Sequence, residues 1–267
     1  STEVANMSSM LGPAPRSHTG PKVVDSEGDL AVSGAGVGAG AGAVNPGVGM
    51  GPTTSTPFQH RFSPYEFNGG TALGVAGPDW VVVASDTRLS SGYSILSRNV
   101  SKGKQVTPHC VICTGGCYTD VATLHKLMGI RAEMYEHKHE SKMTSTAVAQ
   151  LLSTTLYGRR FFPFYAFNVV GGLDKDGRGA VFTYDAIGSY ERVKYAAQGS
   201  GQKLIIPLLD NIVGHKNRTD DVPELTLEET IELMKDAFVT AGEREITVGD
   251  TLELFIITKD GTRVERF

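Results

Sequence analysis

The order of strand-like and helix-like segments constrains this chain more than any other feature of its sequence. From residue 61 onward, β-type runs are followed by two helical patterns, then by further β-type runs, two more helices and a closing hairpin that turns at Asp260-Gly261. This order differs from the single alternation that builds parallel βαβ units. We therefore expect an α+β fold, a four-layer αββα sandwich in which two sheets pack face to face and helices cover both outer sides.

The spacing of apolar residues predicts where the individual strands and helices lie. Apolar and alternating runs predict strands over 71–76, 80–86, 164–172, 179–184 and 190–196, with shorter β runs up to residue 114. Apolar residues at helical spacing predict helices that include 121–135, 148–156, 204–213 and 227–238. Thr144 is the expected cap of the second helix, and a capping box at Thr226–Glu229 is expected to open the fourth.

Residues 1–60 differ in composition from the rest of the chain. All the aromatic residues (1 Trp, 9 Tyr and 11 Phe) fall at or after Phe58, and Ser33–Pro52 is a low-complexity run of Gly, Ala and Val. Such a segment buries too little apolar surface to offset its backbone entropy. Its glycines fit a relaxed dinucleotide fingerprint, but no strand pattern precedes them, so we expect no such cofactor. We predict a disordered tail or propeptide over 1–60 and one domain over 61–267.

Net charge and the length of apolar runs exclude two classes of partner. A net charge of -4 leaves no basic surplus for phosphates, which argues against nucleic-acid binding. The longest apolar runs fall far below the ~20 residues that a membrane-spanning helix needs, and no secretory segment is visible. We therefore expect neither nucleic acid nor a membrane as a partner, and a reducing compartment.

Cys110, Cys113 and Cys117 are spaced in a way that would suit zinc or a redox pair. However, no second ligand pair follows at zinc-finger spacing, and no histidine pairs with a metal partner at i+4 on one helical face. Cys110 and Cys113 are three positions apart in a β-type run, so their side chains should point to opposite faces of the sheet. We expect small buried hydrophobes and no metal. A free-standing cysteine metal protein stays open as an alternative.

Two segments, 62–73 and 82–88, carry the most specific motifs in the chain. The first reads FSPYEFNGGTAL and the second reads VVASDTR. Together they closely resemble the beta subunits of the proteasome. The resemblance implies the N-terminal-nucleophile hydrolase fold, in which the freed α-amino group of a catalytic threonine acts as its general base. In active members an aspartate follows this threonine by 16 positions, and counting back 16 from Asp86 reaches Gly70, which has no hydroxyl.

The other catalytic positions of the family are only partly matched. The same register places Lys102 on the lysine that polarises the nucleophile and Gly116 on the glycine whose N–H forms the oxyanion hole. Ser200, within Gly-Ser-Gly, matches a serine that supports the threonine. The family's later aspartate and serine are replaced by Glu245 and Val248, so the constellation is broken at three points. The positions of this vestigial site are Gly70, Asp86, Lys102, Gly116, Ser200, Glu245 and Val248.

Thr71 is the alternative nucleophile, because a cut after Gly70 would make it N-terminal. Strand alternation sends its side chain to the face opposite that of residue 70, away from Lys102. Since Gly70 has no side chain for attack, we expect no self-removal of the tail, and trimming by an active neighbour just upstream of Phe62. An active threonine hydrolase that uses Thr71 is the rival interpretation.

The match is closest to non-catalytic members of the family, through FSPY (62–65), FNGGT (67–71) and RRFFP (159–163). This resemblance implies a structural subunit of the 20S core particle, a 28-subunit stack of alpha and beta subunits that degrades unfolded polypeptides in cytoplasm and nucleus. Such a subunit completes the beta ring, helps wall the chamber, and uses no cofactor or metal. Asp185 aligns with a position that borders the substrate channel of the adjacent subunit, although a turn residue before Gly188 is the plainer interpretation.

Overall fold

Two five-stranded antiparallel sheets and one short hairpin make up the β structure of the computed structural model, which describes residues 63–219 and 222–267. In spatial order, the first sheet consists of β10 (Tyr195–Gly199), β1 (Thr71–Ala76), β2 (Val81–Asp86), β11 (Leu252–Thr258) and β12 (Gly261–Arg266). The second consists of β5 (Gly103–Thr107), β6 (Cys110–Gly116), β7 (Ala166–Leu173), β8 (Gly179–Tyr184) and β9 (Tyr190–Val193). The hairpin pairs β3 (Leu89–Ser91) with β4 (Ser94–Ser97).

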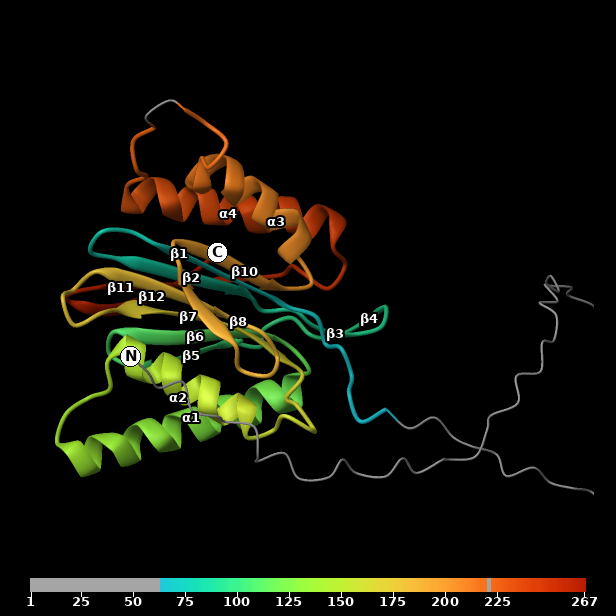
Figure 1. The fold of residues 1–267 in the computed structure, drawn as a ribbon. Helices are drawn as coiled ribbons and strands as arrows, with labels where there is room; N and C mark the ends of the chain where they lie inside the picture. Colours follow the sequence, from blue (N-terminus) through green and yellow to red (C-terminus); the bar gives the residue numbers. More distant parts are fainter. Residues whose placement is uncertain (1–62, 220–221) are drawn as a thin grey trace, which may run out of the picture. The chain divides into compact units, whose positions relative to one another are not determined.

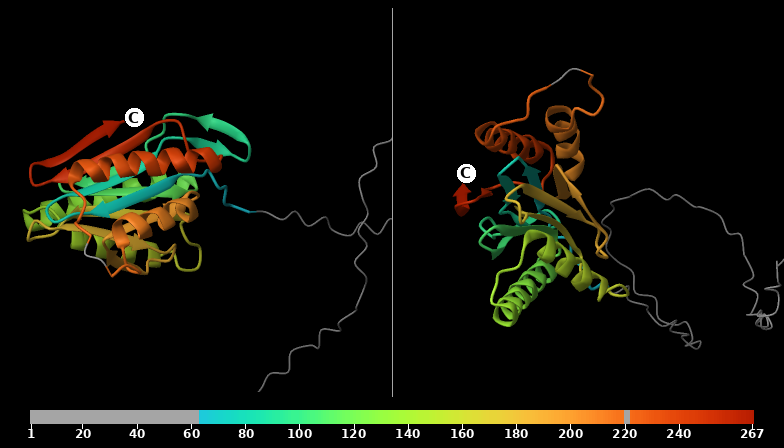
Figure 2. Two further views of the ribbon diagram at one scale, coloured as in Figure 1. Left: turned by 90° about the horizontal axis from the view of Figure 1, so that it is seen from above. Right: turned by 60° about the vertical axis from the view of Figure 1, so that its left-hand side comes forward.

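Two helical layers enclose the sheets (Figure 1). The helices are α1 (Tyr118–His139), α2 (Ser145–Tyr157), α3 (Gln202–Leu209) with its π-helical extension η1 (Asp210–Gly214), and α4 (Leu227–Arg244). Figure 2 shows α3 and α4 on the outer side of one sheet and α1 and α2 on the outer side of the other. The expected αββα sandwich is confirmed. The predicted tail, 1–60, and the trimming point upstream of Phe62 lie outside the described residues.

Three apolar clusters hold the four layers together. One lies between α3, α4 and the first sheet, a second between α1, α2 and the second sheet, and a third between the sheets. Strand alternation distributes neighbours among them, since Val82 joins the first cluster and Val83 the third. Each fully buried leucine, such as Leu124 or Leu254, contributes about 1.5–3 kcal/mol relative to an exposed one. Burial on both faces therefore fixes the register of the central strands.

The cysteine prediction is confirmed in its geometry. Cys110 belongs to the helix-side cluster and Cys113 to the cluster between the sheets, so the two thiols face opposite ways. Burial raises the pKa of Cys110 to about 12, which keeps it a neutral thiol at physiological pH. Within residues 63–219 and 222–267, no group of three or more His, Cys, Asp or Glu side chains is placed to hold a metal ion.

The predicted helix caps are both present. The Thr144 side chain accepts a hydrogen bond from the Ala147 N–H at 3.2 Å. Thr226 and Glu229 form the reciprocal capping box, in which the Glu229 carboxylate accepts from the Thr226 N–H at 2.8 Å. These bonds satisfy N–H groups that have no partner within the helix. None of the helices described is both long and apolar enough to cross a bilayer.

One predicted strand was wrong, and one predicted helix is confirmed but differs in its start and in the type of its last turn. The single strand expected over 190–196 is two strands, because the chain leaves the second sheet after β9 and joins the first as β10. The Lys194 carbonyl at this crossing accepts a bond from the Ala76 N–H at 2.8 Å. The helix expected over 204–213 begins at Gln202 and widens into a π turn at Asp210. Pro207 inside it has no N–H for the regular ladder, which favours such a local change.

Candidate functional site

Gly70 lies immediately before β1 and its missing side chain would point at Lys102. A Cβ atom built on Gly70 would stand 2.7 Å from the Cε atom of Lys102 and 3.1 Å from its Nζ atom. The backbone of Gly70 has φ +91°, a conformation that side-chain-bearing residues rarely adopt. The space that a nucleophile at this position would need is therefore occupied by the lysine side chain.

Lys102 and Asp86 form a buried ion pair beside Gly70. The Nζ atom of Lys102 donates to the Asp86 Oδ2 at 3.0 Å, to the Asp86 carbonyl at 3.0 Å and to the Arg88 carbonyl at 2.5 Å. The two side chains are only 3% and 2% exposed. Burial lowers the pKa of Lys102, and the neighbouring Asp86 charge opposes that shift. Because an ammonium group has three donors, all three are engaged within the fold.

Thr71 is held on the other side of the strand. Its N–H donates to the Asp86 Oδ1 at 2.8 Å, and its Oγ1 accepts from the Gly201 N–H at 2.8 Å. A Cβ atom on Gly201 would lie 2.8 Å from this Oγ1 and 3.5 Å from Val248, so the hydroxyl faces the start of α3. With 0% of its surface exposed, Thr71 is enclosed. This placement agrees with the expectation that its side chain points away from Lys102.

The backbone of Asn68 and Gly69, just before β1, forms hydrogen bonds with the backbone of Gly116. The Gly116 N–H donates to the Gly69 carbonyl at 3.0 Å, and the Gly116 carbonyl accepts from the Asn68 N–H at 3.1 Å. The Ser200 N–H donates to the Gly70 carbonyl at 3.1 Å. The Gly116 N–H, which the resemblance predicts as an oxyanion-hole donor, is thus bound to a carbonyl of this chain.

The Thr247 side chain connects Ser200 to Glu245. The Thr247 Oγ1 lies 2.8 Å from the Ser200 Oγ and 2.8 Å from the Glu245 Oε1. Val248, on the next position, is buried at 1% exposure and offers no polar atom. The seven predicted positions are therefore brought together around the start of β1, with Glu245 in an outer position.

Sequence reasoning missed two residues that the structure places in the site. Thr247 links Ser200 to Glu245, and a Cβ atom on Gly69 would meet the Thr247 Cβ, so the two residues are in close contact. Asn68 is buried and bonded on both its backbone and its side chain. The only sequence signals were their positions next to aligned residues, because an isolated Thr or Asn carries no motif of its own.

Asp185 lies apart from this constellation, in the exposed turn after β8. Its Oδ1 accepts from the Ile187 N–H at 3.0 Å and from the Ser189 N–H at 2.8 Å. Both bonds stay within the turn, as in an Asx turn. The structure therefore gives Asp185 a local turn-forming role.

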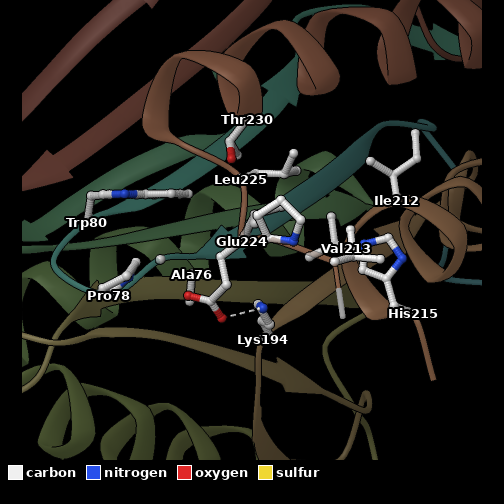
Figure 3. A pocket seen from close by; sticks show the side chains of 14 residues that line it. Ala76, Pro78, Trp80, Lys194, Ile212, Val213, His215, Glu224, Leu225 and Thr230 are labelled. Carbon is white, nitrogen blue, oxygen red and sulfur yellow. Dashed lines mark hydrogen bonds and ion pairs between the residues drawn. The ribbon is translucent and has the colours of Figure 1, made fainter. Parts of the chain in front are cut away.

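The small pocket beside η1 shares no residue with the Gly70 constellation (Figure 3). Trp80, His215 and the segment 222–225 line it, and an ion pair of 2.7 Å joins Lys194 to Glu224 at its wall. Its cavity of about 40 Å³ has room for only a few water molecules. It is too small to hold a peptide side chain with its backbone.

Comparison with known proteins gives consistent matches over the described fold. The family model described as "Proteasome subunit" matches residues 66–257, a range that contains all seven predicted site positions. Proteasome subunit beta type-1-B of Carassius auratus is 51% identical over 213 residues, which cover 79% of this chain and 90% of the relative. Proteasome subunit beta type-1 of Arabidopsis thaliana is 49% identical over 213 residues, or 78% of this chain and 96% of the relative. Proteasome subunit beta type-6 of Saccharomyces cerevisiae is 41% identical over 222 residues, or 79% and 92%.

Proposed function

The chain belongs to the proteasome subunit family, and from this premise we propose that it is a non-catalytic, structural beta subunit of the 20S core particle. One observation carries the proposal. The position that the family register assigns to the nucleophile is Gly70, and the Lys102 side chain fills the space beside its Cα. Two of the relatives, from Carassius auratus and Arabidopsis thaliana, are named proteasome subunits of beta type-1, which supports the assignment as a beta subunit.

The chemistry of acyl transfer supports this interpretation. A threonine hydrolase needs a free hydroxyl next to its own α-amino group and a polarising lysine. Here the residue after Gly70 is Thr71, whose hydroxyl accepts a bond from the Gly201 N–H and is fully buried. The Ser200 hydroxyl lies 3.5 Å from the Gly70 carbonyl, but Ser200 is an internal residue and has no α-amino group of its own to act as a base. The ammonium of Lys102 is bonded to three oxygens of the fold. Neither Gly70, which has no hydroxyl, nor the enclosed Thr71 is therefore available to attack a peptide carbonyl.

The outer surface supports an assembly role. Large apolar side chains are exposed at the β3–β4 hairpin, which extends beyond the layers in Figure 1, and after α2. Tyr93 and Phe161 are each 98% exposed, and Phe162 is 55% exposed. Exposed clusters of this kind mark protein–protein contacts. Neighbouring alpha and beta subunits bury them, and the subunit thereby completes the beta ring and walls the chamber in which unfolded polypeptides are degraded.

Further parts of the proposal concern the tail, the location and the neighbouring site. Residues 1–60 are a tail or propeptide that active neighbours trim, and 61–267 is the ring-forming domain. The particle works in cytoplasm and nucleus. Asp185 borders the substrate channel of the adjacent subunit, and its exposure supports this, while its turn bonds fix the carboxylate in place.

Covalent labelling of the purified particle tests the proposal. A peptide electrophile that reacts with N-terminal threonines is expected to modify the sister subunits and to leave the mass of this chain unchanged. A particle that carries Thr71→Ala is the matched control. An adduct on Thr71 of the wild-type chain, absent from the control, would establish the rival interpretation of an active threonine hydrolase.

A further inference from the structure

A cavity of about 370 Å³ lies at the end of the sheets opposite the Gly70 constellation, and we call it the far-end cavity. β6 runs from Cys110 to Gly116, so Gly116 lies at the constellation and Cys110 lies about 20 Å away from it. The turns that follow β5, β7 and β11 line the cavity beside Cys110, together with the connection between α1 and α2. Figure 1 shows this connection at the left, opposite the β3–β4 hairpin at the right.

Hydrogen bonds between the turns fix the walls of the far-end cavity. The Nδ1 atom of His109 donates to the Thr258 carbonyl at 3.1 Å, since a carbonyl can only accept. The Thr262 hydroxyl donates to the Pro108 carbonyl at 2.8 Å, and the Leu173 N–H donates to the His109 carbonyl at 3.1 Å. The cavity is therefore preformed by the fold, as sites for ligands usually are.

Lysine side chains from three separate segments line the far-end cavity. Lys142 precedes α2, Lys175 lies in the β7–β8 turn and Lys259 lies in the β11–β12 turn. All three residues are exposed, and within the described ranges only Lys142 has an ion pair, an exposed one with Glu136 at 3.5 Å. A Cβ atom on Gly177 would stand 3.3 Å from the Lys259 Cε, so this lysine lies against the β7–β8 turn. The three lysines make the cavity rim positive.

Asp174 is the one acidic residue among the described residues that line the cavity, and its carboxylate is already bonded. Its Oδ1 accepts from the N–H groups of Asp176 and Arg178, each at 3.0 Å. Its Oδ2 pairs with Arg192 at 3.0 Å. Because these bonds lie within its own turn and the adjacent strand, Asp174 leaves the three lysines without an acidic partner in the cavity.

The buried part of the cavity wall is apolar and meets the start of α2. Met143 and Leu173 are each 8% exposed. Ser145, the first residue of α2, is 2% exposed, and its Oγ atom has no hydrogen-bond partner within the part of the chain that the structure describes. Thr144 caps the Ala147 N–H, which leaves the Ser145 N–H without a partner inside the helix. A ligand oxygen at this helix start would satisfy groups that are costly to leave unbonded.

These features together select an anionic ligand with an apolar part. Carboxylates complement the lysines and the N-terminus of α2, and an apolar side chain complements Met143 and Leu173. A single tetrahedral anion would leave most of the volume unfilled. We propose that the far-end cavity binds an acidic peptide segment of a partner protein, with one apolar side chain against the buried wall and carboxylates against the lysines. The inference rests on the proposed function only for its setting, in which the Gly70 constellation faces the chamber and the opposite end faces outside partners.

A binding measurement on the assembled particle tests the cavity. The sister sites are first blocked with the covalent electrophile, and a fluorescein-tagged heptapeptide amide with one leucine between two runs of three glutamates is titrated in. We expect saturable binding, seen as a rise in fluorescence anisotropy, that weakens as salt is added. The Lys175→Glu/Lys259→Glu variant should bind about tenfold more weakly. Lys126→Glu/Lys138→Glu changes the net charge equally at exposed positions of α1 outside the cavity and should bind as wild type.

Acetylation of lysines keeps the test decisive if the charge-reversed subunit fails to enter the particle. In the wild-type particle, peptide at ten times its dissociation constant should slow the acetylation of Lys142, Lys175 and Lys259 about tenfold. Acetylation of Lys126 and Lys138 should not change. Absence of this protection, equal protection of all five lysines, or cavity lysines that are unreactive without peptide would each overturn the proposal.

Two further probes test the class of ligand. A heptapeptide with serine in place of leucine should bind about tenfold more weakly, because it has no apolar side chain for the buried wall. Inorganic phosphate that displaces the tagged peptide at equal concentration would show a simple anion site and would contradict the peptide assignment. Any of these failures leaves the proposed function standing while the electrophile modifies only the sister subunits, whereas an adduct on Thr71 contradicts the proposed function itself.

Discussion

The start of β1 buries polar side chains, whereas the β3–β4 hairpin and the segment after α2 expose apolar ones. Around Gly70, charged and polar groups are buried and every donor of Lys102 is bonded. At the β3–β4 hairpin and after α2, large apolar residues such as Tyr93 and Phe161 are exposed to solvent. The interior site is therefore closed by its own hydrogen bonds, whereas the apolar surface has side chains left to be covered. Substitutions around Gly70 should therefore change the free energy of unfolding, whereas substitutions on the apolar surface should change assembly.

The largest effect is expected from removing one partner of the buried ion pair. Lys102→Ala leaves the Asp86 carboxylate buried and uncompensated, which should lower the free energy of unfolding by about 3–5 kcal/mol. Urea denaturation of the isolated chain measures this. Lys142→Ala breaks the exposed pair with Glu136 and should cost less than about 1 kcal/mol. Equal losses in the two variants would contradict the account of a sealed interior site.

The second largest loss of stability is expected from adding a side chain at position 70. Gly70→Ala combines a positive φ with a Cβ atom 2.7 Å from the Lys102 Cε, and we expect a loss of about 2–3 kcal/mol in urea denaturation. Gly92→Ala separates the two causes, because Gly92 has φ +54° but no atom within 4 Å of its Cβ position. It should lose only about 1 kcal/mol. A tolerated Gly70→Ala substitution would show that the space beside Lys102 is free.

Substitutions on the exposed apolar surface should weaken assembly and leave the free energy of unfolding nearly unchanged. Phe161→Ser removes a ring that is 98% exposed, so the unfolding free energy should change by less than about 0.5 kcal/mol. If a neighbour buries this ring, incorporation into the particle should weaken by about 2 kcal/mol, or roughly thirtyfold. Competition with wild-type chain during assembly, followed by sedimentation, measures the ratio. Lys175→Ser, at an exposed polar position, is the control. Unchanged incorporation of Phe161→Ser would remove this ring from the contact surface.

The smallest effect concerns a buried polar network outside the site. The Nε2 of His125 lies 2.8 Å from the Thr114 Oγ1, and burial lowers the pKa of His125 to about 4. Since the unfolded chain binds a proton near pH 6.5, stability is complete above that pH and is lost as the pH falls toward 4. We expect a loss of about 1 kcal/mol between pH 7 and pH 5.5 that the His125→Gln variant does not show. Parallel pH dependence in both proteins would contradict this role.

Helices and strands could be predicted from the sequence more fully than the way the chain passes between sheets and the contacts between distant residues. Apolar periodicity and the caps at Thr144 and Thr226 are local signals, so the helices and most strands followed from them. The division of 190–196 between two sheets did not, because the segment reads as one continuous β-type run and only the tertiary fold separates the two strands. At the site, fixed spacing from Asp86 located Gly70. Asn68 and Thr247 escaped because their partners, Tyr118 and Ser200, are distant in sequence.

The intact mass of this chain, recovered from the native particle, tests the central claim most directly. If Gly70 cannot attack and residues 68–70 remain buried, the mature chain must begin upstream of Asn68 and retain both glycines. A mass that corresponds to a chain beginning at Gly70 or Thr71 would show cleavage at the vestigial site and would contradict the account.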